Sequence, residues 1–322
     1  MLISFIFFPF IHFVFSQQDV LNTVLQESAI VLINEDKSIG AEIDYTRLGD
    51  PTICGYSSKS QRTVAQAGRG VTKIRDWPWM AVLILVADPS IIVCGAAVIT
   101  RRHLLTAAHC FNDIDKNQLL VRLGEYDFNR ATESNKTDYR VEDLRIPNDY
   151  YPAAHHNDIA ILKLDKTIEY SVYVQPICLP LPQDDYTDTT AVVTGWGQIE
   201  YHGQFSKVLL EVSLPIWELK KCRQRYESTI FCTNICAGYE EGERDSCAGD
   251  SGGPLMQQRQ DGRWTVIGVV SWGRRCAAKQ SPGVYTAVNK YLDWIAENTQ
   301  DVDAQSVYLQ DSVIGNALQP PF

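Results

Sequence analysis

Short apolar runs separated by turn-forming residues dominate the chain from residue 77 onward. The runs are rich in β-branched and aromatic residues, and clusters of Gly, Pro, Asn and Asp bound them. This pattern is typical of an all-β barrel or sandwich. It predicts strands at residues 80–86, 94–100, 103–106, 119–123, 159–164, 191–194, 207–214, 264–271 and 283–288.

The two ends of the chain have a different texture. Residues 2–15 are almost entirely apolar and give way abruptly to polar sequence, which predicts a cleaved secretory signal at residues 1–16. The alternative is a buried N-terminal strand or helix. Residues 17–62 have too few apolar residues to form an independent core, and they hold one cysteine, so we expect them to be a pro-segment. Apolar residues at helical spacing predict a helix near residues 291–295, and residues 299–322 form a polar C-terminal tail.

Composition narrows the classes of protein that this chain could belong to. The 322 residues are 45% hydrophobic and 21% charged, which is ordinary for one large globular domain or two small ones. A net charge of −10 argues against nucleic-acid binding. No internal stretch reaches the roughly 18 apolar residues of a membrane-spanning helix, so no membrane partner is expected. Nine cysteines behind an export signal indicate a secreted, extracellular protein.

Three short segments carry the chemistry. Residues 105–110 end a predicted strand with His109, residues 156–164 begin one after Asp158, and residues 245–255 place Ser251 in a glycine-rich turn. The chain order His, Asp, Ser is one of the few in which a hydrolytic triad occurs.

The triad chemistry requires these residue types. A serine hydroxyl is a poor nucleophile at neutral pH and needs an adjacent base, and histidine has the matching basicity. A buried carboxylate on the other ring nitrogen fixes the histidine tautomer. The glycines around the serine leave the backbone N–H groups of Gly249 and Ser251 free to stabilise an oxyanion.

On these segments, residues 63–298 resemble the trypsin-like serine proteases of the chymotrypsin fold. The resemblance implies an all-β fold of two six-stranded antiparallel barrels with a C-terminal helix. It also implies a serine endopeptidase in which His109 is the general base, Asp158 orients it, and Ser251 forms the acyl-enzyme.

The same resemblance implies a preference for Arg or Lys. Asp245, six residues before Ser251, corresponds to the floor of the specificity pocket, where a carboxylate would be unpaired until a cationic side chain entered. The pocket walls correspond to Ser271, Trp272, Gly273 and Gly283. The two glycines leave room for a long side chain.

The resemblance further implies four disulfides, one of which tethers the pro-segment to the protease domain. The pairs are Cys54–Cys178, Cys94–Cys110, Cys222–Cys236 and Cys247–Cys276. Cys232 is left over. It is free, paired differently from this scheme, or joined to another molecule.

Activation is where the chain departs from its relatives. They are cut after a basic residue, and the new apolar N-terminus, followed by a glycine pair, turns inward to the acid before the nucleophile, here Asp250. Residues 60–71 contain no such sequence. The best candidate is a cut between Arg62 and Thr63, by another protease. Two hypotheses follow: an active protease, or a non-catalytic or weakly active homologue that acts as a binding cofactor.

Lesser features complete the expectations. Asn135 begins the only glycosylation sequon. Some relatives bind calcium in the loop that here holds Glu125, Asp127, Glu133 and Asp138, but their ligand spacing is not reproduced, so we expect a solvated acidic loop and no metal cofactor. His155 and His156 are expected to be subsite walls rather than metal ligands. By analogy the partners are a protein substrate, an activating protease and protease inhibitors, in a clotting or immune cascade.

Overall fold

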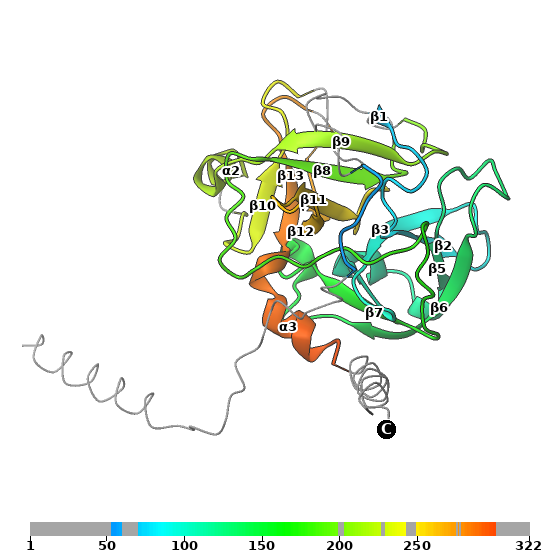
Figure 1. The fold of residues 1–322 in the computed structure, drawn as a ribbon. Helices are drawn as coiled ribbons and strands as arrows, with labels where there is room; N and C mark the ends of the chain where they lie inside the picture. Colours follow the sequence, from blue (N-terminus) through cyan, green and yellow to red (C-terminus); the bar gives the residue numbers. More distant parts are fainter. Residues whose placement is uncertain are drawn as a thin grey trace, which may run out of the picture. The chain divides into compact units, whose positions relative to one another are not determined.

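Six antiparallel strands close into a barrel between residues 80 and 164, in the order β2-β3-β4-β7-β6-β5 (Figure 1). The buried strands are continuous apolar runs, whereas β5 alternates between buried and partly exposed positions, the period-2 pattern of a strand with one face in the core. The strands are β2 (Met80–Leu85), β3 (Ile92–Val98), β4 (His103–Thr106), β5 (Leu119–Leu123), β6 (Thr137–Arg145) and β7 (Ala160–Leu164).

The second β structure is a seven-stranded antiparallel sheet in the order β1-β9-β8-β11-β12-β13-β10. An isolated bridge from Ile216 to Ala237 joins the edge strand β10 to the residue after β9. Among the described residues the strand pairing does not otherwise close this sheet, so the first expected barrel is present and the second is not confirmed. The strands are β1 (Gly70–Val71), β8 (Thr190–Gly195), β9 (Leu210–Pro215), β10 (Asn234–Ala237), β11 (Pro254–Gln258), β12 (Trp264–Trp272) and β13 (Gly283–Ala287).

The computed structural model describes residues 53–59, 70–198, 203–226, 229–242, 249–274, 276 and 278–300. The predicted signal, most of the pro-segment, most of the C-terminal tail and the residues Arg62, Thr63, Asp245 and Cys247 lie outside these ranges. The helices are α2 (Leu219–Tyr226) and α3 (Leu292–Glu297), with 3-10 turns at η2 (Ala108–Phe111), η3 (Lys116–Gln118), η4 (Pro152–Ala154) and η5 (Val288–Lys290). No helix in the described ranges is long and apolar enough to cross a membrane.

One apolar core connects the barrel to the sheet. Trp77 packs edge to face on Trp79, the residue before β2, with ring centroids 5.8 Å apart. It also packs edge to face on Trp264, the first residue of β12, with ring centroids 4.7 Å apart. All three indoles are buried. Large aromatic side chains bury much apolar surface per residue, so packing as well as hydrogen bonding holds the barrel against the sheet.

Residues 53–59, near the end of the predicted pro-segment, contact the protease domain. Cys54 forms a disulfide with Cys178, and Gly55 exchanges backbone hydrogen bonds with Pro176 and Trp264. Gly55 has a φ of +74°, and a Cβ there would lie 2.5 Å from the Trp264 carbonyl oxygen. The close approach therefore requires glycine.

Each of the nine ranges predicted from the sequence overlaps a strand, and the predicted helix is α3. Sequence patterning missed β1, β6, β10, β11 and α2. In β6 most positions are polar because little of the strand is buried, and in β11 the apolar run is short and follows the glycine-rich turn directly. Helix α2 has only two buried residues, so its apolar periodicity is weak.

Candidate active site

His109 and Asp158 meet because of the register between two barrel strands. Thr106, the last residue of β4, pairs with Ala160, the first residue of β7. His109 lies in the η2 turn that follows β4, and Asp158 lies in the segment that enters β7. The imidazole Nδ1 is 2.8 Å from Oδ2 of the carboxylate. The antiparallel ladder therefore delivers both side chains to the same end of the barrel.

Asp158 is fully buried and saturated with hydrogen bonds. Its Oδ1 accepts the backbone N–H of His109 at 2.9 Å, and its Oδ2 accepts both His109 Nδ1 and the Ser271 hydroxyl. Its backbone carbonyl accepts the Thr286 hydroxyl at 2.7 Å. Ser271 is on β12 and Thr286 is on β13. Two strands of the sheet therefore donate hydrogen bonds to Asp158, which belongs to the barrel.

These hydrogen bonds keep Asp158 ionised. Burial alone would raise the pKa of the Asp158 carboxyl, but the hydrogen bonds from His109 and Ser271, together with the nearby His155, outweigh it and hold the pKa well below its ordinary value. An ionised carboxylate on Nδ1 fixes the His109 tautomer that leaves Nε2 free to accept a proton. The His109 side chain is 17% exposed, so the ring remains accessible.

The turn that carries Ser251 is fastened to both β structures. The Ser251 carbonyl accepts the Gly95 N–H from β3 at 2.7 Å, and the Gly252 N–H donates to Val270 on β12 at 2.8 Å. Gly252 has a φ of +75°, and a Cβ there would lie 2.3 Å from the Thr106 hydroxyl oxygen. Only glycine fits this approach, which brings the turn against the strand that leads to His109.

The Ser251 hydroxyl and the N–H groups of Gly249 and Ser251 are the groups of this turn that were expected to act in catalysis. In the described part of the chain, the Ser251 hydroxyl does not hydrogen-bond with His109, and the N–H groups of Gly249 and Ser251 have no backbone acceptor. Catalytic hydrogen bonds are often loose without substrate. Gly249 has a φ of +95°, and a Cβ there would lie 2.5 Å from the Phe205 ring. The strained turn thus suits glycine at the expected oxyanion position.

The residues expected to form the specificity pocket have mixed outcomes. Asp245 lies outside the described residues. Gly273 follows β12 and Gly283 begins β13, and a Cβ on Gly273 would meet Gly283 Cα at 3.9 Å, which is an ordinary contact distance. Trp272 stacks on His155. Sequence reasoning missed the bond from Ser271 to Asp158, which no local motif encodes.

Asp250, the expected partner of a new N-terminus, is buried in a glycine cradle. Its Oδ1 accepts the Gly197 N–H at 2.9 Å, and a Cβ on Gly195 would lie 2.1 Å from the same atom. Arg62 and Thr63 lie outside the described residues. The nearest described residues on either side of them, Lys59 and Gly70, both contact Glu211. Lys59 forms an ion pair with its carboxylate, and Gly70 pairs with its backbone.

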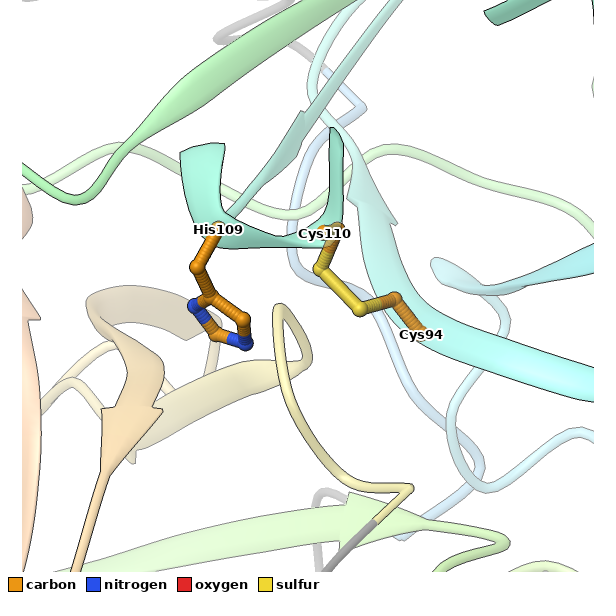
Figure 2. A group of neighbouring side chains, drawn as sticks. All are labelled: Cys94, His109 and Cys110. Atoms are coloured by element: carbon orange, nitrogen blue, oxygen red, sulfur yellow. A yellow bond between two sulfur atoms is a disulfide. The ribbon is translucent and has the colours of Figure 1, made fainter. Parts of the chain in front are cut away.

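Figure 2 shows His109 next to the Cys94–Cys110 disulfide. The ligand atoms of these three residues lie within 4.8 Å of one another, but both sulfurs are bonded to each other, so they are not thiolate ligands for a metal. Cys54–Cys178 and Cys222–Cys236 are also formed, and these three pairs match the expectation. Cys276 is disulfide-bonded, with its expected partner outside the described residues, and Cys232 is free and exposed.

The acidic loop that follows β5 is neutralised by basic side chains of the chain itself. The Lys136 ammonium bonds Glu125 Oε2 at 2.9 Å and the Arg130 carbonyl at 3.2 Å. Arg122 makes two bonds to Asp138 and lies 3.4 Å from Glu125. The Glu125 side chain is 1% exposed, so a buried carboxylate already has its cation. A calcium ion would have to displace Lys136, and these residues therefore do not fit calcium. Asn135 is exposed.

A closed β-barrel that carries a His–Asp pair, next to a glycine-rich turn that carries a serine, is typical of serine proteases. Residues 67–295 match the family model described as Trypsin. The chain belongs to the trypsin family and is a trypsin-like serine protease.

Curated relatives from arthropods agree with the family assignment. The proclotting enzyme of Tachypleus tridentatus is 40% identical over 261 residues, which are 77% of this chain and 69% of the relative. The venom protease of Bombus pensylvanicus is 40% identical over 231 residues, 69% of this chain and 93% of the relative. The clotting factor G beta subunit of Tachypleus tridentatus is 35% identical over 262 residues, 76% and 82% of the two chains.

Proposed function

We propose that this chain is a secreted serine endopeptidase that cleaves peptide bonds after Arg or Lys through an acyl-enzyme on Ser251. The observation that carries the proposal is the 2.8 Å bond from His109 Nδ1 to a buried, ionised Asp158, at the strand end against which the Ser251 turn packs. Further support comes from the N–H groups of Gly249 and Ser251, which have no backbone acceptor among the described residues.

In the proposed reaction, His109 Nε2 takes the proton of the Ser251 hydroxyl as its oxygen attacks the scissile carbonyl carbon. Asp158 stabilises the imidazolium that forms, and the N–H groups of Gly249 and Ser251 donate to the oxyanion. The imidazolium then protonates the leaving amine. Water, deprotonated by the same imidazole, hydrolyses the ester on Ser251 and regenerates the enzyme.

Specificity in this proposal rests on Asp245, which would pair with the guanidinium or ammonium of the substrate. The absence of side chains at Gly273 and Gly283 supports entry of a long substrate side chain. The isolated bridge between Ile216 and Ala237 supports the inference that the sheet is the second barrel of the fold. No metal is required, because Lys136 supplies the charge that a cation would bring to Glu125.

Control by another protease is the proposed regulation. A cut between Arg62 and Thr63 would leave residues 17–62 attached through Cys54–Cys178. The new N-terminus would then reach Asp250, beside the small hollow lined by Thr194, Gly195 and Glu211. The names of the clotting relatives support a cascade with a protein substrate, an activating protease and inhibitors. N-terminal sequencing of the active chain tests the cut; a start elsewhere than Thr63 would overturn it.

The activity is tested with the purified chain after limited trypsin treatment and removal of the trypsin. It is assayed against matched short amides with Arg, Lys or Phe at the scissile position, beside a Ser251→Ala variant. We expect hydrolysis of the Arg and Lys amides only, abolished in the variant. A preference for Phe would refute the role of Asp245. No hydrolysis of any amide would favour the alternative, a homologue that binds without cleaving.

A further inference from the structure

A hollow of about 300 Å³ lies where the chain leaves Gly273, one of the residues expected to form the specificity pocket. Three basic side chains line it: Arg225, Arg274 and Lys279. Lys279 is paired with Glu241 at 2.9 Å. Arg225 and Arg274 are exposed, and within the described ranges neither of them forms a hydrogen bond or an ion pair. A chain with a net charge of −10 thus presents two guanidinium groups without an acidic partner in one hollow.

The Arg274 guanidinium packs on an aromatic ring. Its central carbon lies 5.1 Å from the centroid of the Tyr226 ring. Tyr226 is buried at the end of α2, meets the Trp272 ring edge to face at 5.0 Å, and donates its hydroxyl to the Pro282 carbonyl. A guanidinium on the face of a ring keeps its N–H donors for another partner. Arg225, the residue before Tyr226, brings the second guanidinium to the same hollow from α2.

The strand that leads to Arg274 passes the Ser251 turn and then has an open edge. β12 pairs with β11 as far as Val269, and Val270 then forms backbone hydrogen bonds with the turn itself. In the part of the chain that the structure describes, the backbone N–H and carbonyl of Gly273 have no hydrogen-bond partner. A peptide can add to such an edge as a further strand. A substrate bound at Ser251 is therefore led toward Arg274.

We propose that Arg274 and Arg225 form a subsite that selects an acidic side chain in the protein substrate. The acidic residue lies at the third or fourth position before the cleaved bond, counting the Arg or Lys at that bond as the first. The placement of this subsite rests on the proposed function, in which the bond is cleaved at Ser251.

The position follows from the length of an extended chain. Ser271 bonds to Asp158 of the proposed triad, and Arg274 follows Ser271 by three residues, which is about 10 Å of extended chain. A substrate strand antiparallel to residues 271–273 covers the same distance in about three residues. Its third or fourth side chain before the cleaved bond then lies beside Arg274.

The chemistry of the hollow favours a carboxylate on a peptide. A guanidinium binds a carboxylate through two parallel N–H donors, whereas a basic substrate residue would be repelled by both arginines. A long polyanion such as a sulfated polysaccharide needs a row of cations. The third cation here, Lys279, already has Glu241 as its partner. Two free guanidinium groups match one or two carboxylates.

Hydrolysis is measured on the activated chain with Ser251 intact. The substrates are three anilides with the sequences Glu-Glu-Gly-Arg, Gln-Gln-Gly-Arg and Lys-Lys-Gly-Arg. Because an exposed ion pair contributes modestly, we expect kcat/KM for the Glu-Glu substrate to exceed that for the Gln-Gln substrate about fivefold at low salt. The difference should lie mainly in KM, since the pair forms equally with substrate and transition state, and it should shrink when NaCl is added.

The variants change the charge of the hollow. Arg274→Gln should bring the ratio of the two kcat/KM values close to one, and Arg225→Gln should lower it in part. Arg274→Glu should reverse the preference, so that the Lys-Lys substrate is cleaved better than the Glu-Glu substrate. Loss of folding cannot produce such a reversal. The matched control is Arg259→Gln, which should leave the ratio unchanged, because Arg259 lies in the turn at the other end of β12 and faces Asp261.

Binding is measured separately, on the trypsin-treated chain carrying Ser251→Ala. Fluorescent peptides with the three sequences, each extended beyond the Arg, are titrated by anisotropy. We expect the Glu-Glu peptide to bind more tightly than the Gln-Gln peptide, and Arg274→Gln to remove the difference. Equal binding of the two peptides, or a preference that survives Arg274→Gln, would overturn the subsite. Heparin binding that depends on Arg274, without any preference among the peptides, would overturn it in favour of a polyanion site.

The two measurements separate this subsite from the proposed function. A chain that hydrolyses none of the anilides but binds the Glu-Glu peptide preferentially through Arg274 would refute the proposed function alone. Hydrolysis of the Glu-Glu and Gln-Gln anilides with equal kcat/KM would refute the subsite alone.

Discussion

Thr106 and Ala160 lie opposite each other in the ladder between β4 and β7, and this pairing sets the bond between His109 and Asp158. His109 lies just after the end of β4, and Asp158 lies just before the start of β7. A register slip of one residue would turn every side chain of a strand to the other face. The geometry of the site is therefore a property of the barrel, in which β4 is fully buried.

Replacing Asp158 by Asn tests the orienting role of the carboxylate. The amide can donate to Nδ1 instead of accepting from it, which stabilises the wrong His109 tautomer. We expect kcat/KM on an Arg amide to fall on the order of 10⁴-fold, the magnitude known for this change in related triads, with kcat carrying most of the loss. The matched control is Asp165→Asn, an exposed acid on the segment after β7. A loss of less than tenfold in Asp158→Asn would contradict the role.

The lowered pKa of Asp158 also predicts how stability depends on pH. A carboxyl whose pKa is lower in the folded than in the unfolded chain adds stability above its unfolded pKa of about 3.9, and this stability is lost as the pH falls toward the folded pKa. The difference in free energy of unfolding between wild type and Asp158→Asn should thus be constant from pH 5 to 6 and shrink between pH 4 and 2.5. Urea titrations measure it, and a difference that grows on acidification would contradict the assignment.

Local sequence motifs point to the residues of the candidate site, but not to the residues that hold them in place. His109, Asp158 and Ser251 stand out because local motifs surround them, and the strands next to them are apolar enough to be recognised. The bonds from Ser271 and Thr286 to Asp158 join residues more than a hundred positions apart, so only the folded chain reveals them. His155 was expected to form a subsite wall, and its closeness to both His109 and Asp158 depends on a left-handed backbone that the sequence does not encode.

The acidic loop offers a further test at Lys136. Its ammonium is bound to the buried carboxylate of Glu125, so Lys136→Gln leaves that charge with Arg122 alone and should cost about 1–3 kcal/mol of stability. The substitution keeps the glycosylation sequon at Asn135. We expect calcium to raise the Tm of the variant and to leave the wild-type Tm unchanged.

The matched control for that experiment is Lys279→Gln, because Lys279 pairs with Glu241 at the surface, where both side chains are more than half exposed. It should change the Tm by less than 1 °C with or without calcium. Stabilisation of the wild-type chain by calcium would show that the loop binds the metal despite Lys136.

The cysteine pairing predicts a single reactive thiol. Cys232 is free and exposed, and Cys276 is disulfide-bonded, with Cys247 as its expected partner. The native chain should therefore release one equivalent of chromophore from a thiol reagent, and Cys232→Ser should release none. Two or more equivalents would contradict the pairing of Cys247 with Cys276.

The central claim is that Ser251 is a nucleophile activated by His109. Labelling with a serine-directed phosphonate that carries an Arg-like side chain, followed by mass spectrometry of the peptides, tests it most directly. After trypsin activation, the account predicts one phosphonyl adduct, on Ser251, and loss of labelling in His109→Ala. An activated, folded chain that takes no label at Ser251, or that labels equally well without His109, would contradict it.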